Sequence, residues 1–286
     1  MKKAISLLLG LFLIIGLTAC GSNQKTDKNA GSTPQKTTKL VVGASPVPHA
    51  EILNHIKPIL KKKGIDLEVK EFQDYILPNK ALAAGQIDAN YFQHIPYLES
   101  QEKQNGYKFA NVGAVHIEPI GIYSKKYKSV KDLPNGATII MSNSVADQGR
   151  LLGLLQQAGL IKLKSGVGYN GTFKDIENNP KHLKLQANVD AGLLPKIYKN
   201  GEGDAVMINT NYALAAGLNP LKDAIALENG NSPFANIVVT QEKDKNNPAI
   251  KTLVDVLQSK DVQQWILDKW KGAIVPVKLS ELKQNK

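Results

Sequence analysis

Strand-like and helix-like patterns alternate along this chain from Leu40 onward, and this alternation restricts its fold more than any other feature. Short apolar runs predict strands over 40–43, 65–72, 87–92, 119–123, 137–141, 205–208 and 237–240. Helical patterns, several opened by proline or closed by glycine, are predicted over 48–64, 78–84, from 96 onward, 146–158, 211–216 and, as two helices, within 248–270. Strands that alternate with helices indicate an α/β fold.

A short motif occurs twice and suggests two similar halves. Residues 85–89 read GQIDA and residues 201–205 read GEGDA, so both have the pattern G-x-x-D-A. Each copy leads into a predicted strand and then into a polar turn before a helix. The repeat fits two lobes of similar plan, each contributing a strand end to a shared cleft.

The first twenty residues have the composition of an export signal. Lys2 and Lys3 precede an apolar run, 4–16, that is shorter than the roughly 20 residues needed to span a bilayer. The run ends in Leu-Thr-Ala-Cys, and Cys20 is the only cysteine of the chain. This tetrapeptide resembles the lipobox of bacterial lipoproteins, which implies a signal peptide at 1–19 and a lipid on Cys20. A plain secretory signal with a chance cysteine is the alternative.

The segment that follows, 20–38, is predicted to be a flexible tether. After Cys20 it consists of small and polar residues with no aliphatic side chain larger than alanine. Such a segment cannot bury a hydrophobic core. The body beyond it has no cysteine, so an exported body must depend on its core rather than on disulfides.

The formal charge of +11 falls to +9 without Lys2 and Lys3. The lysines are scattered without interleaved aromatic residues, which argues against nucleic-acid binding and favours a solvated surface suited to an anionic cell wall. Arg150 is the only arginine. A guanidinium binds a carboxylate through two hydrogen bonds, which lysine cannot do, so Arg150 is a candidate for binding an acidic ligand group.

Polar residues gather where predicted strands end and helices begin, at 45–49, 90–97, 142–150 and 209–212. Ligands of α/β sheets bind at such junctions. The side chains there suit a zwitterion with an apolar tail: Arg150 for the carboxylate, Asn209 and Glu118 for the ammonium, and aromatic rings for the tail. The alternatives are ordinary structural roles, with Phe92 in the core and His94 and Asn209 at helix starts.

Motifs for catalysis or metal binding are lacking. The five histidines form neither HxH nor HExxH, so no metal site is predicted, although a histidine paired with a distant carboxylate stays an alternative. There is no G-x-S-x-G elbow and no phosphate-binding loop. No cofactor or catalytic residue is predicted, and a hydrolase triad assembled from distant residues is a second alternative.

Several runs of the body resemble the methionine-binding lipoproteins of bacterial methionine ABC importers. These runs are FQDYILPN at 72–79, IDANYFQH at 87–94, HIEP at 116–119, GLIKL at 159–163, INTNYA at 208–213 and SPFANIVV at 232–239. The resemblance implies a two-lobed periplasmic-binding-protein fold, type II-like, in which each lobe is a mixed sheet flanked by helices. One lobe would comprise 39–118 plus 233–286 and the other 119–232, with two hinge crossings between them.

The resemblance also implies a set of ligand-binding residues. It places four aromatic side chains around the side chain of methionine, namely Tyr75, Phe92, His94 and Tyr97. Arg150 would bind the carboxylate and Asn209 the backbone end of the ligand. Asn143 and Glu118 complete the expected site.

Two segments of the second lobe depart from the family pattern. The usual Asn-Asp-Pro-Thr-Asn run before Gly-Arg reads NSVAD at 143–147, followed by Gln148, and Gln-Leu-Pro-Arg becomes LLPK at 193–196. Both would lie near the backbone end of the ligand. L-methionine, D-methionine and a methionine-containing dipeptide therefore all stay candidates.

The expected function is capture of this solute at the extracytoplasmic face of the cell membrane. The protein would close on its ligand and deliver it to an ABC permease driven by a cytoplasmic ATPase. The lysine-rich tether favours a Gram-positive cell surface. A surface adhesin with the same fold is the alternative from a different functional class.

Overall fold

The computed structural model describes residues 37–230, 232–278 and 280. The predicted signal peptide, Cys20 and all but the last two residues of the predicted tether lie outside this part of the chain. Thr38, at the end of the predicted tether, already belongs to a strand. Within the described part, no helix has the length and apolar character required to cross a membrane.

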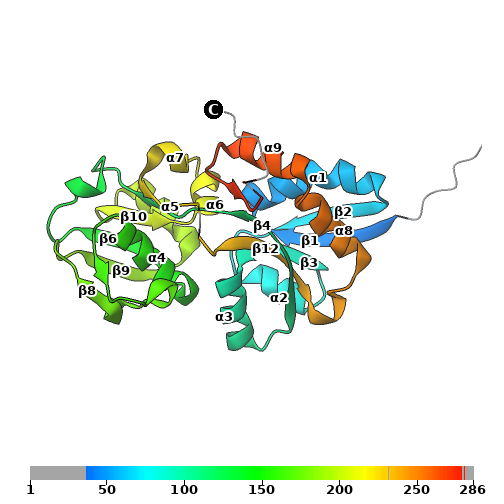
Figure 1. The fold of residues 1–286 in the computed structure, drawn as a ribbon, viewed down its shortest axis with the longest axis horizontal. Coiled ribbons are helices and arrows are strands. Elements are labelled where there is room, and N and C mark those ends of the chain that lie inside the picture. Colours follow the sequence, from blue (N-terminus) through cyan, green and yellow to red (C-terminus); the bar gives the residue numbers. More distant parts are fainter. Residues whose placement is uncertain (1–36, 231, 279, 281–286) are drawn as a thin grey trace, which may run out of the picture. The chain divides into compact units, whose positions relative to one another are not determined.

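The first of two main sheets has six strands, in the order β13-β4-β12-β3-β1-β2 (Figure 1). β1 is parallel to β2 and β3, whereas β12 is antiparallel to β3 and β4, so the sheet is mixed. The strands are β1 (Thr38–Ala44), β2 (Ile65–Glu71), β3 (Ala89–His94), β4 (Phe109–Ile117), β12 (Ala235–Gln241) and β13 (Val275–Pro276).

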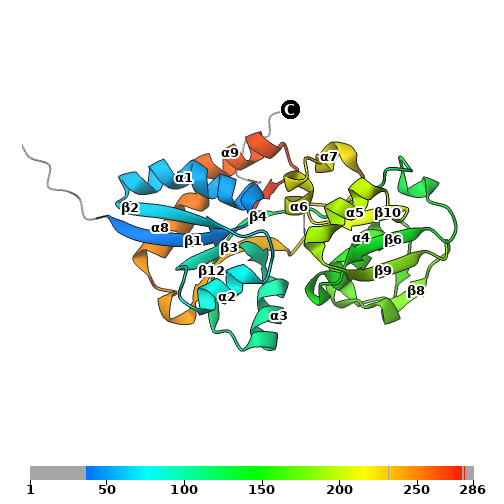
Figure 2. The same ribbon diagram turned by 180° about the vertical axis from the view of Figure 1, so that it is seen from behind.

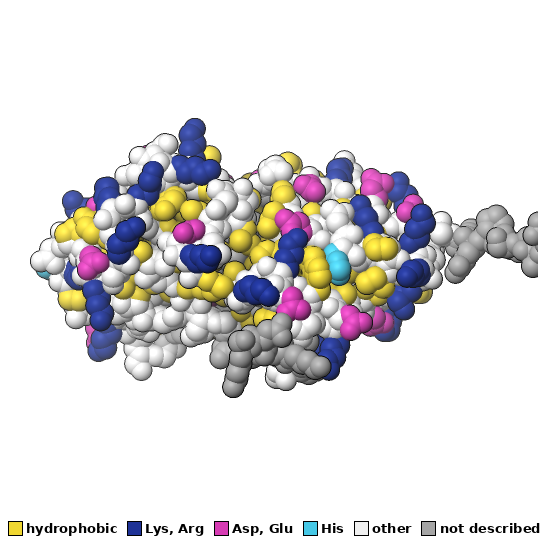
Figure 3. Space-filling model, turned by 90° about the horizontal axis from the view of Figure 1, so that it is seen from above, with side chains coloured by type: hydrophobic (Ala, Val, Ile, Leu, Met, Phe, Trp, Pro, Cys, Tyr) yellow, Lys and Arg dark blue, Asp and Glu magenta, His cyan; other side chains and the backbone are white. Residues whose placement is uncertain are grey.

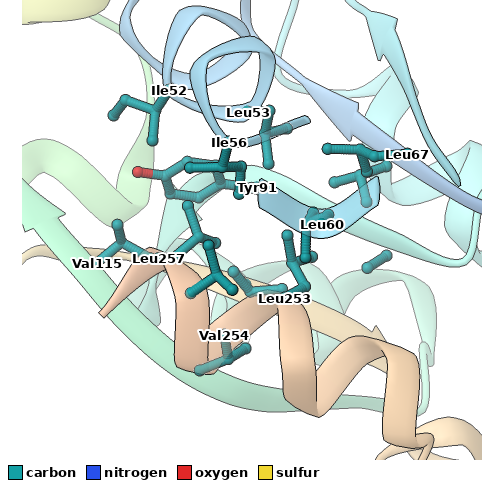
Figure 4. Packing of buried hydrophobic residues seen from close by; sticks show 14 of the residues in the cluster. Ile52, Leu53, Ile56, Leu60, Leu67, Tyr91, Val115, Leu253, Val254 and Leu257 are labelled. Atoms are coloured by element: carbon teal, nitrogen blue, oxygen red, sulfur yellow. The ribbon is translucent and has the colours of Figure 1, made fainter. Parts of the chain in front are cut away.

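Both faces of this sheet are covered by helices. Alternate side chains of β1 point to opposite faces, as the pleat requires: Val42 packs with α1 and α8, and Val41 packs on the side of α2 and α3. Figure 4 shows the first of these layers, in which Leu53 of α1 and Leu253 of α8 belong to one buried cluster. The helices are α1 (Glu51–Lys62), preceded by the short turn η1 (Pro46–Ala50), α2 (Leu77–Ala83), α3 (Ile95–Asn105), α8 (Pro248–Leu257) and α9 (Lys260–Trp270).

The second sheet has five strands, in the order β11-β5-β10-β6-β9 (Figure 2). It is also mixed, because β6 is parallel to β9 and β10 whereas β5 is antiparallel to β10 and β11. Its strands are β5 (Gly121–Tyr123), β6 (Thr138–Ser142), β9 (Lys184–Val189), β10 (Ala205–Ile208) and β11 (Ala224–Leu227). A separate pair is formed by β7 (Lys162–Leu163) and β8 (Ile176–Asn178).

Helices cover both faces of the second sheet as well. Ile139 of β6 packs with leucines of α4, whereas Ile140 packs with Leu194 of α5. The helices here are α4 (Val145–Gln157), α5 (Leu194–Asn200), α6 (Thr210–Ala215) and α7 (Pro220–Asp223). The chain passes from the first sheet to the second between Ile117 and Gly121, and returns between Leu227 and Ala235. The predicted α/β class with mixed sheets is confirmed, while the predicted lobe boundaries stay a prediction.

The repeated G-x-x-D-A motif performs one structural task in both sheets. Asp88 Oδ2 accepts a hydrogen bond from Val41 N at 2.7 Å, and Asp204 Oδ2 accepts one from Thr138 N at 2.8 Å. In each case the aspartate lies directly before a strand, and its side chain accepts a hydrogen bond from the backbone of the neighbouring strand. The repeat therefore marks equivalent strand entries in the two sheets.

The lysines are spread over the face seen in Figure 3, where other side chains separate them. This distribution matches the solvated surface expected from their scatter in the sequence.

Candidate functional site

A cavity with about 410 Å³ of empty space lies where β3 of the first sheet and β10 of the second sheet end. Side chains of β3 and β12 in the first sheet, and of α4 and α6 next to the second sheet, contribute to its wall. The lining residues are Tyr75, Phe92, Gln93, His94, Tyr97, Glu118, Ile120, Asp147, Arg150, Asn209, Thr210, Asn211 and Asn236.

Seven of the eight residues predicted to bind a ligand line this cavity. The seven are Tyr75, Phe92, His94, Tyr97, Glu118, Arg150 and Asn209. The structure places the eighth, Asn143, outside the lining: its side chain is exposed. Its backbone N–H donates to the Val189 carbonyl at 2.8 Å, so Asn143 extends the β6–β9 pairing instead of facing the cavity.

One wall of the cavity consists of three aromatic rings. The ring centroids of Tyr75, Phe92 and Tyr97 lie 6.0–6.1 Å from one another, in tilted or edge-to-face arrangements. The Tyr97 hydroxyl donates to the Tyr75 carbonyl at 2.9 Å, and the Tyr75 hydroxyl donates to Asn211 Oδ1 at 2.6 Å. Burial raises the pKa of Tyr75 and of Tyr97, so both phenols are neutral and the wall is uncharged.

His94 has both of the roles considered for it from the sequence. It is the N-cap of α3, where its Nδ1 accepts a hydrogen bond from Tyr97 N at 3.2 Å. Its Nε2 lies 3.0 Å from Asp147 Oδ1 across the cavity. The ring also packs edge-on against Phe234 at 5.1 Å. The helix cap thus holds the ring in the orientation that presents Nε2 to the cavity.

Arg150 is buried and already has a carboxylate partner within the protein. Its Nε lies 3.0–3.1 Å from the two carboxylate oxygens of Glu228, and its Nη2 donates to Glu228 Oε2 at 2.6 Å. Nη2 also donates to the Glu118 carbonyl at 2.6 Å, and the guanidinium carbon lies 4.5 Å from the centre of the Phe234 ring. Sequence reasoning missed Glu228, since a single glutamate near a strand end carries no distinctive pattern.

Glu118 lies at the first crossing between the sheets, against two buried histidines. Its Oε1 lies 2.8 Å from His116 Nε2 and 3.2 Å from His49 Nε2, and its Oε2 accepts a hydrogen bond from Asn211 N at 3.0 Å. The His116 Nδ1 is hydrogen-bonded to the hydroxyl of Tyr91. These contacts connect β4 to the N-terminus of α6, which follows a strand of the other sheet.

Burial determines the protonation of this cluster. It lowers the pKa of His49 to about 4 and that of His116 to about 3, so both rings are neutral near pH 7. Burial also raises the pKa of Glu118, although His49 and Arg150 oppose that change. One possible metal-ligand atom from each of His49, His116 and Glu118 lies within 4.8 Å of the other two, which is close enough to consider a metal ion. In the structure His116 Nε2 is hydrogen-bonded to Glu118 Oε1 at 2.8 Å, and His49 Nε2 is hydrogen-bonded to Asn236 Oδ1 at 3.0 Å.

Asp147 is a cavity residue that sequence reasoning missed. Its side chain is 3 % exposed, and its two oxygens accept hydrogen bonds from His94 Nε2 at 3.0 Å and from Asn209 Nδ2 at 3.3 Å. Burial favours a higher pKa, but His94, Arg150 and Asn209 outweigh it, and the pKa of Asp147 lies below its ordinary value. An aspartate in the first turn of a helix is common, so the sequence did not distinguish it.

Asn209 presents an unused acceptor to the cavity. Its side-chain Oδ1 is buried and has no hydrogen-bond partner among the described residues. Buried acceptors without a partner are uncommon because desolvation without a hydrogen bond is costly. Asn209 therefore has the capacity to accept a hydrogen bond from a ligand.

Comparison with known proteins is consistent with this architecture. The family model of the NlpA lipoproteins matches residues 40–278. The methionine-binding lipoprotein MetQ of Bacillus subtilis (strain 168) is 50% identical over 283 residues, which are 97% of this chain and 99% of that protein.

Two solved structures share the fold over most of the chain. A nutrient-binding protein from Burkholderia cenocepacia, solved bound to methionine, is 47% identical with a TM-score of 0.78 and covers 83% of this chain and 99% of its own. A periplasmic substrate-binding protein of an ABC transporter from Coxiella burnetii is 39% identical with a TM-score of 0.78, and the match covers 83% of this chain and 100% of that one. Sequence, fold and the extent of these matches establish that the chain belongs to the NlpA lipoprotein family.

Proposed function

We propose that this protein is an extracytoplasmic solute-binding lipoprotein that captures methionine or a close relative of it. The observation that carries the proposal is the division of the cavity into two chemically different sides. Three aromatic rings form one side, and the charged and amide groups of Arg150, Asp147 and Asn209 form the other. An amino acid with an apolar side chain has the matching division.

The proposed pose follows from this division. The thioether of methionine packs against Tyr75, Phe92 and Tyr97, where a sulfur–aromatic contact contributes about 0.3–1.5 kcal/mol. The carboxylate approaches Arg150, whose Nε and Nη2 are engaged with Glu228, so that Nη1 is the nitrogen that would receive it. The ammonium lies at the acceptors near Asn209, with Glu118 also on this side. L-methionine, D-methionine and a methionine-containing dipeptide satisfy these features.

The proposed mechanism is closure of two lobes, 39–118 with 233–286 and 119–232, around the solute. Residues next to the first sheet already contact residues next to the second sheet across the cavity: Tyr75 donates to Asn211, and His94 contacts Asp147. A ligand that binds the closed arrangement more tightly than an open one shifts the population toward closure. No bond of the ligand is broken in this process.

Lipid on Cys20 would hold the protein at the outer face of the cell membrane, which we propose is that of a Gram-positive cell. The tether would keep the binding lobes near an ABC permease and its ATPase, raising their effective concentration there. This part of the proposal is supported by the lipobox-like LTAC at 17–20 and by the ABC-transporter protein among the related structures.

A thermal-shift panel tests the ligand assignment. The protein, freed of bound solute by dialysis from urea, is melted with L-methionine, D-methionine, Gly-Met and each other amino acid. A ligand present at 100 times its Kd stabilises the folded state by about 2.7 kcal/mol, so methionine or its relatives should raise Tm and the other amino acids should not. A panel without any shift, or turnover of an ester or amide substrate, would contradict the proposal in favour of an adhesin or a hydrolase.

A further inference from the structure

Asp147 is a buried carboxylate without a cationic partner. Among the described residues, His94 is the only basic side chain within 4.0 Å of its oxygens. Arg150, the one arginine of the chain, is hydrogen-bonded to Glu228 instead. Burying a charge costs desolvation free energy unless an opposite charge is paired with it. A positive group next to the Asp147 carboxylate would therefore be stabilising.

His94 does not provide that positive charge. Its Nδ1 accepts a hydrogen bond from the backbone N–H of Tyr97 and therefore carries no proton. The proton of the ring is then on Nε2, which donates it to Asp147 Oδ1. His94 is a neutral donor in this arrangement, and the charge of Asp147 is stabilised but not neutralised.

Asp147 also determines which way the amide of Asn209 faces. An ionised carboxylate only accepts hydrogen bonds, so Asn209 must present its Nδ2 to Asp147 Oδ2, at 3.3 Å. The other end of the amide, Oδ1, is left buried and without a partner. Two acceptors, one of them charged, are thus placed next to each other on the cavity wall.

The second carboxylate of the cavity is less available. Glu118 has three nitrogen neighbours, His116 Nε2 and His49 Nε2 at Oε1 and Asn211 N at Oε2, whereas each oxygen of Asp147 has one. Burial raises the pKa of Glu118, whereas the pKa of Asp147 lies below its ordinary value. Asp147 is therefore the carboxylate that keeps its charge and has room to accept further hydrogen bonds.

We propose that Asp147 and Asn209 Oδ1 together form the binding site for a primary ammonium group of the ligand, and that the protein requires a free α-amine. This inference rests on the proposed function, because it specifies the end of the amino acid that the polar side of the cavity selects. An ammonium donates three hydrogen bonds and supplies the missing charge. Ligands with an acylated or absent amine leave Asp147 unpaired and are rejected.

Calorimetric titration of the full-length protein in detergent, freed of bound solute, tests the proposal. The ligands are L-methionine, L-methioninamide, N-acetyl-L-methionine and 4-(methylthio)butanoate, which lacks the amine. Wild type should bind L-methionine at least about tenfold more tightly than N-acetyl-L-methionine or 4-(methylthio)butanoate, as expected for loss of an ionic hydrogen bond. L-methioninamide keeps the amine but lacks the carboxylate, and its affinity should fall on Asp147→Asn as that of methionine does. Asp147→Asn should weaken methionine binding by about tenfold or more and leave 4-(methylthio)butanoate unaffected.

The matched control is Asp66→Asn, which makes the same change on the exposed face of β2 and should preserve the wild-type ranking. Asp147→Ser, together with a thermal melt of each variant, separates loss of folding from loss of selectivity. An Asp147→Asn protein that retains the wild-type preference for amine-bearing ligands overturns the ammonium site while leaving the proposed function intact. A wild-type protein that binds none of the four ligands overturns the proposed function itself.

Discussion

His94 Nε2 lies 3.0 Å from Asp147 Oδ1, and this hydrogen bond joins the end of β3 in the first sheet to the first turn of α4 beside the second sheet. The two residues are separated by 53 positions in the chain. The contact orients a buried acid and at the same time bridges the cavity.

We expect His94→Ala to weaken methionine binding by about 1.5–3 kcal/mol, the contribution typical of a hydrogen bond to a charged group. His94→Gln should recover part of that loss, because its amide nitrogen can donate to Asp147. Calorimetry on both variants measures the difference. Equal affinities for the alanine and glutamine variants would show that the hydrogen bond does not contribute to binding.

Arg150→Met should destabilise the protein by about 3–5 kcal/mol, because Glu228 would remain buried without its partner. The double variant with Glu228→Leu should regain much of this stability, since no uncompensated charge is left. Urea unfolding measures the free energy of unfolding of each protein. Lys251→Met, at the exposed pair with Asp255, is the control and should change stability by at most about 1 kcal/mol.

A double variant that is no more stable than Arg150→Met alone would contradict the assignment of the loss to an unpaired Glu228. Any additional loss of methionine affinity in these variants reports on the proposed role of Arg150 at the ligand carboxylate.

The buried histidines should make stability depend on pH. The folded-state pKa values of about 4 for His49 and about 3 for His116 lie below the ordinary value of 6.5, so the unfolded chain binds more protons at intermediate pH. Their contribution is fully present above about pH 6.5 and is lost as the pH falls toward 4 and then 3. Glu118, whose pKa is raised, acts in the opposite direction.

His49→Asn should therefore reduce the pH dependence of unfolding between pH 6.5 and 4, by up to roughly 1.4 kcal/mol per pH unit. Urea unfolding at a series of pH values provides the slope. His182→Asn, at an exposed histidine, is the control and should retain the wild-type slope. The assignment fails if the two variants have the same slope.

Tyr75→Phe keeps the ring of the aromatic wall and removes the hydroxyl that donates to Asn211 Oδ1 across the cavity. We expect a loss of about 0.5–1.5 kcal/mol in methionine binding, and a larger loss for Tyr75→Ala, which also removes the ring. Titration calorimetry compares the two variants.

Tyr107→Phe, at a ring stacked on Phe109 away from the cavity, is the control. If the phenylalanine and alanine variants of Tyr75 had equal affinities, a contribution from the ring would be excluded.

Most of the strands were predictable because their apolar runs are local and glycines close several of the helices between them. The strands β4, β9 and β11 and the short strands β7, β8 and β13 were not predicted. In β4 (Phe109–Ile117) the mixture of buried and half-buried positions lacks a clear alternation. The helix predicted over 48–64 begins instead as the turn η1 and continues as α1, because Val47 has an extended backbone conformation at the kink.

The sequence by itself determined the α/β class and the junctions at which polar side chains gather, since both follow from short-range patterns and from the common edge of parallel strands. Only the tertiary structure decided which of those side chains meet. It paired Arg150 with Glu228, 78 residues away, brought Asp147 beside His94 and Asn209, and placed Asn143 outside the cavity. Such contacts depend on how the two sheets pack. The partners of buried charges and amides are close in space but distant in the sequence, so no short-range pattern identifies them.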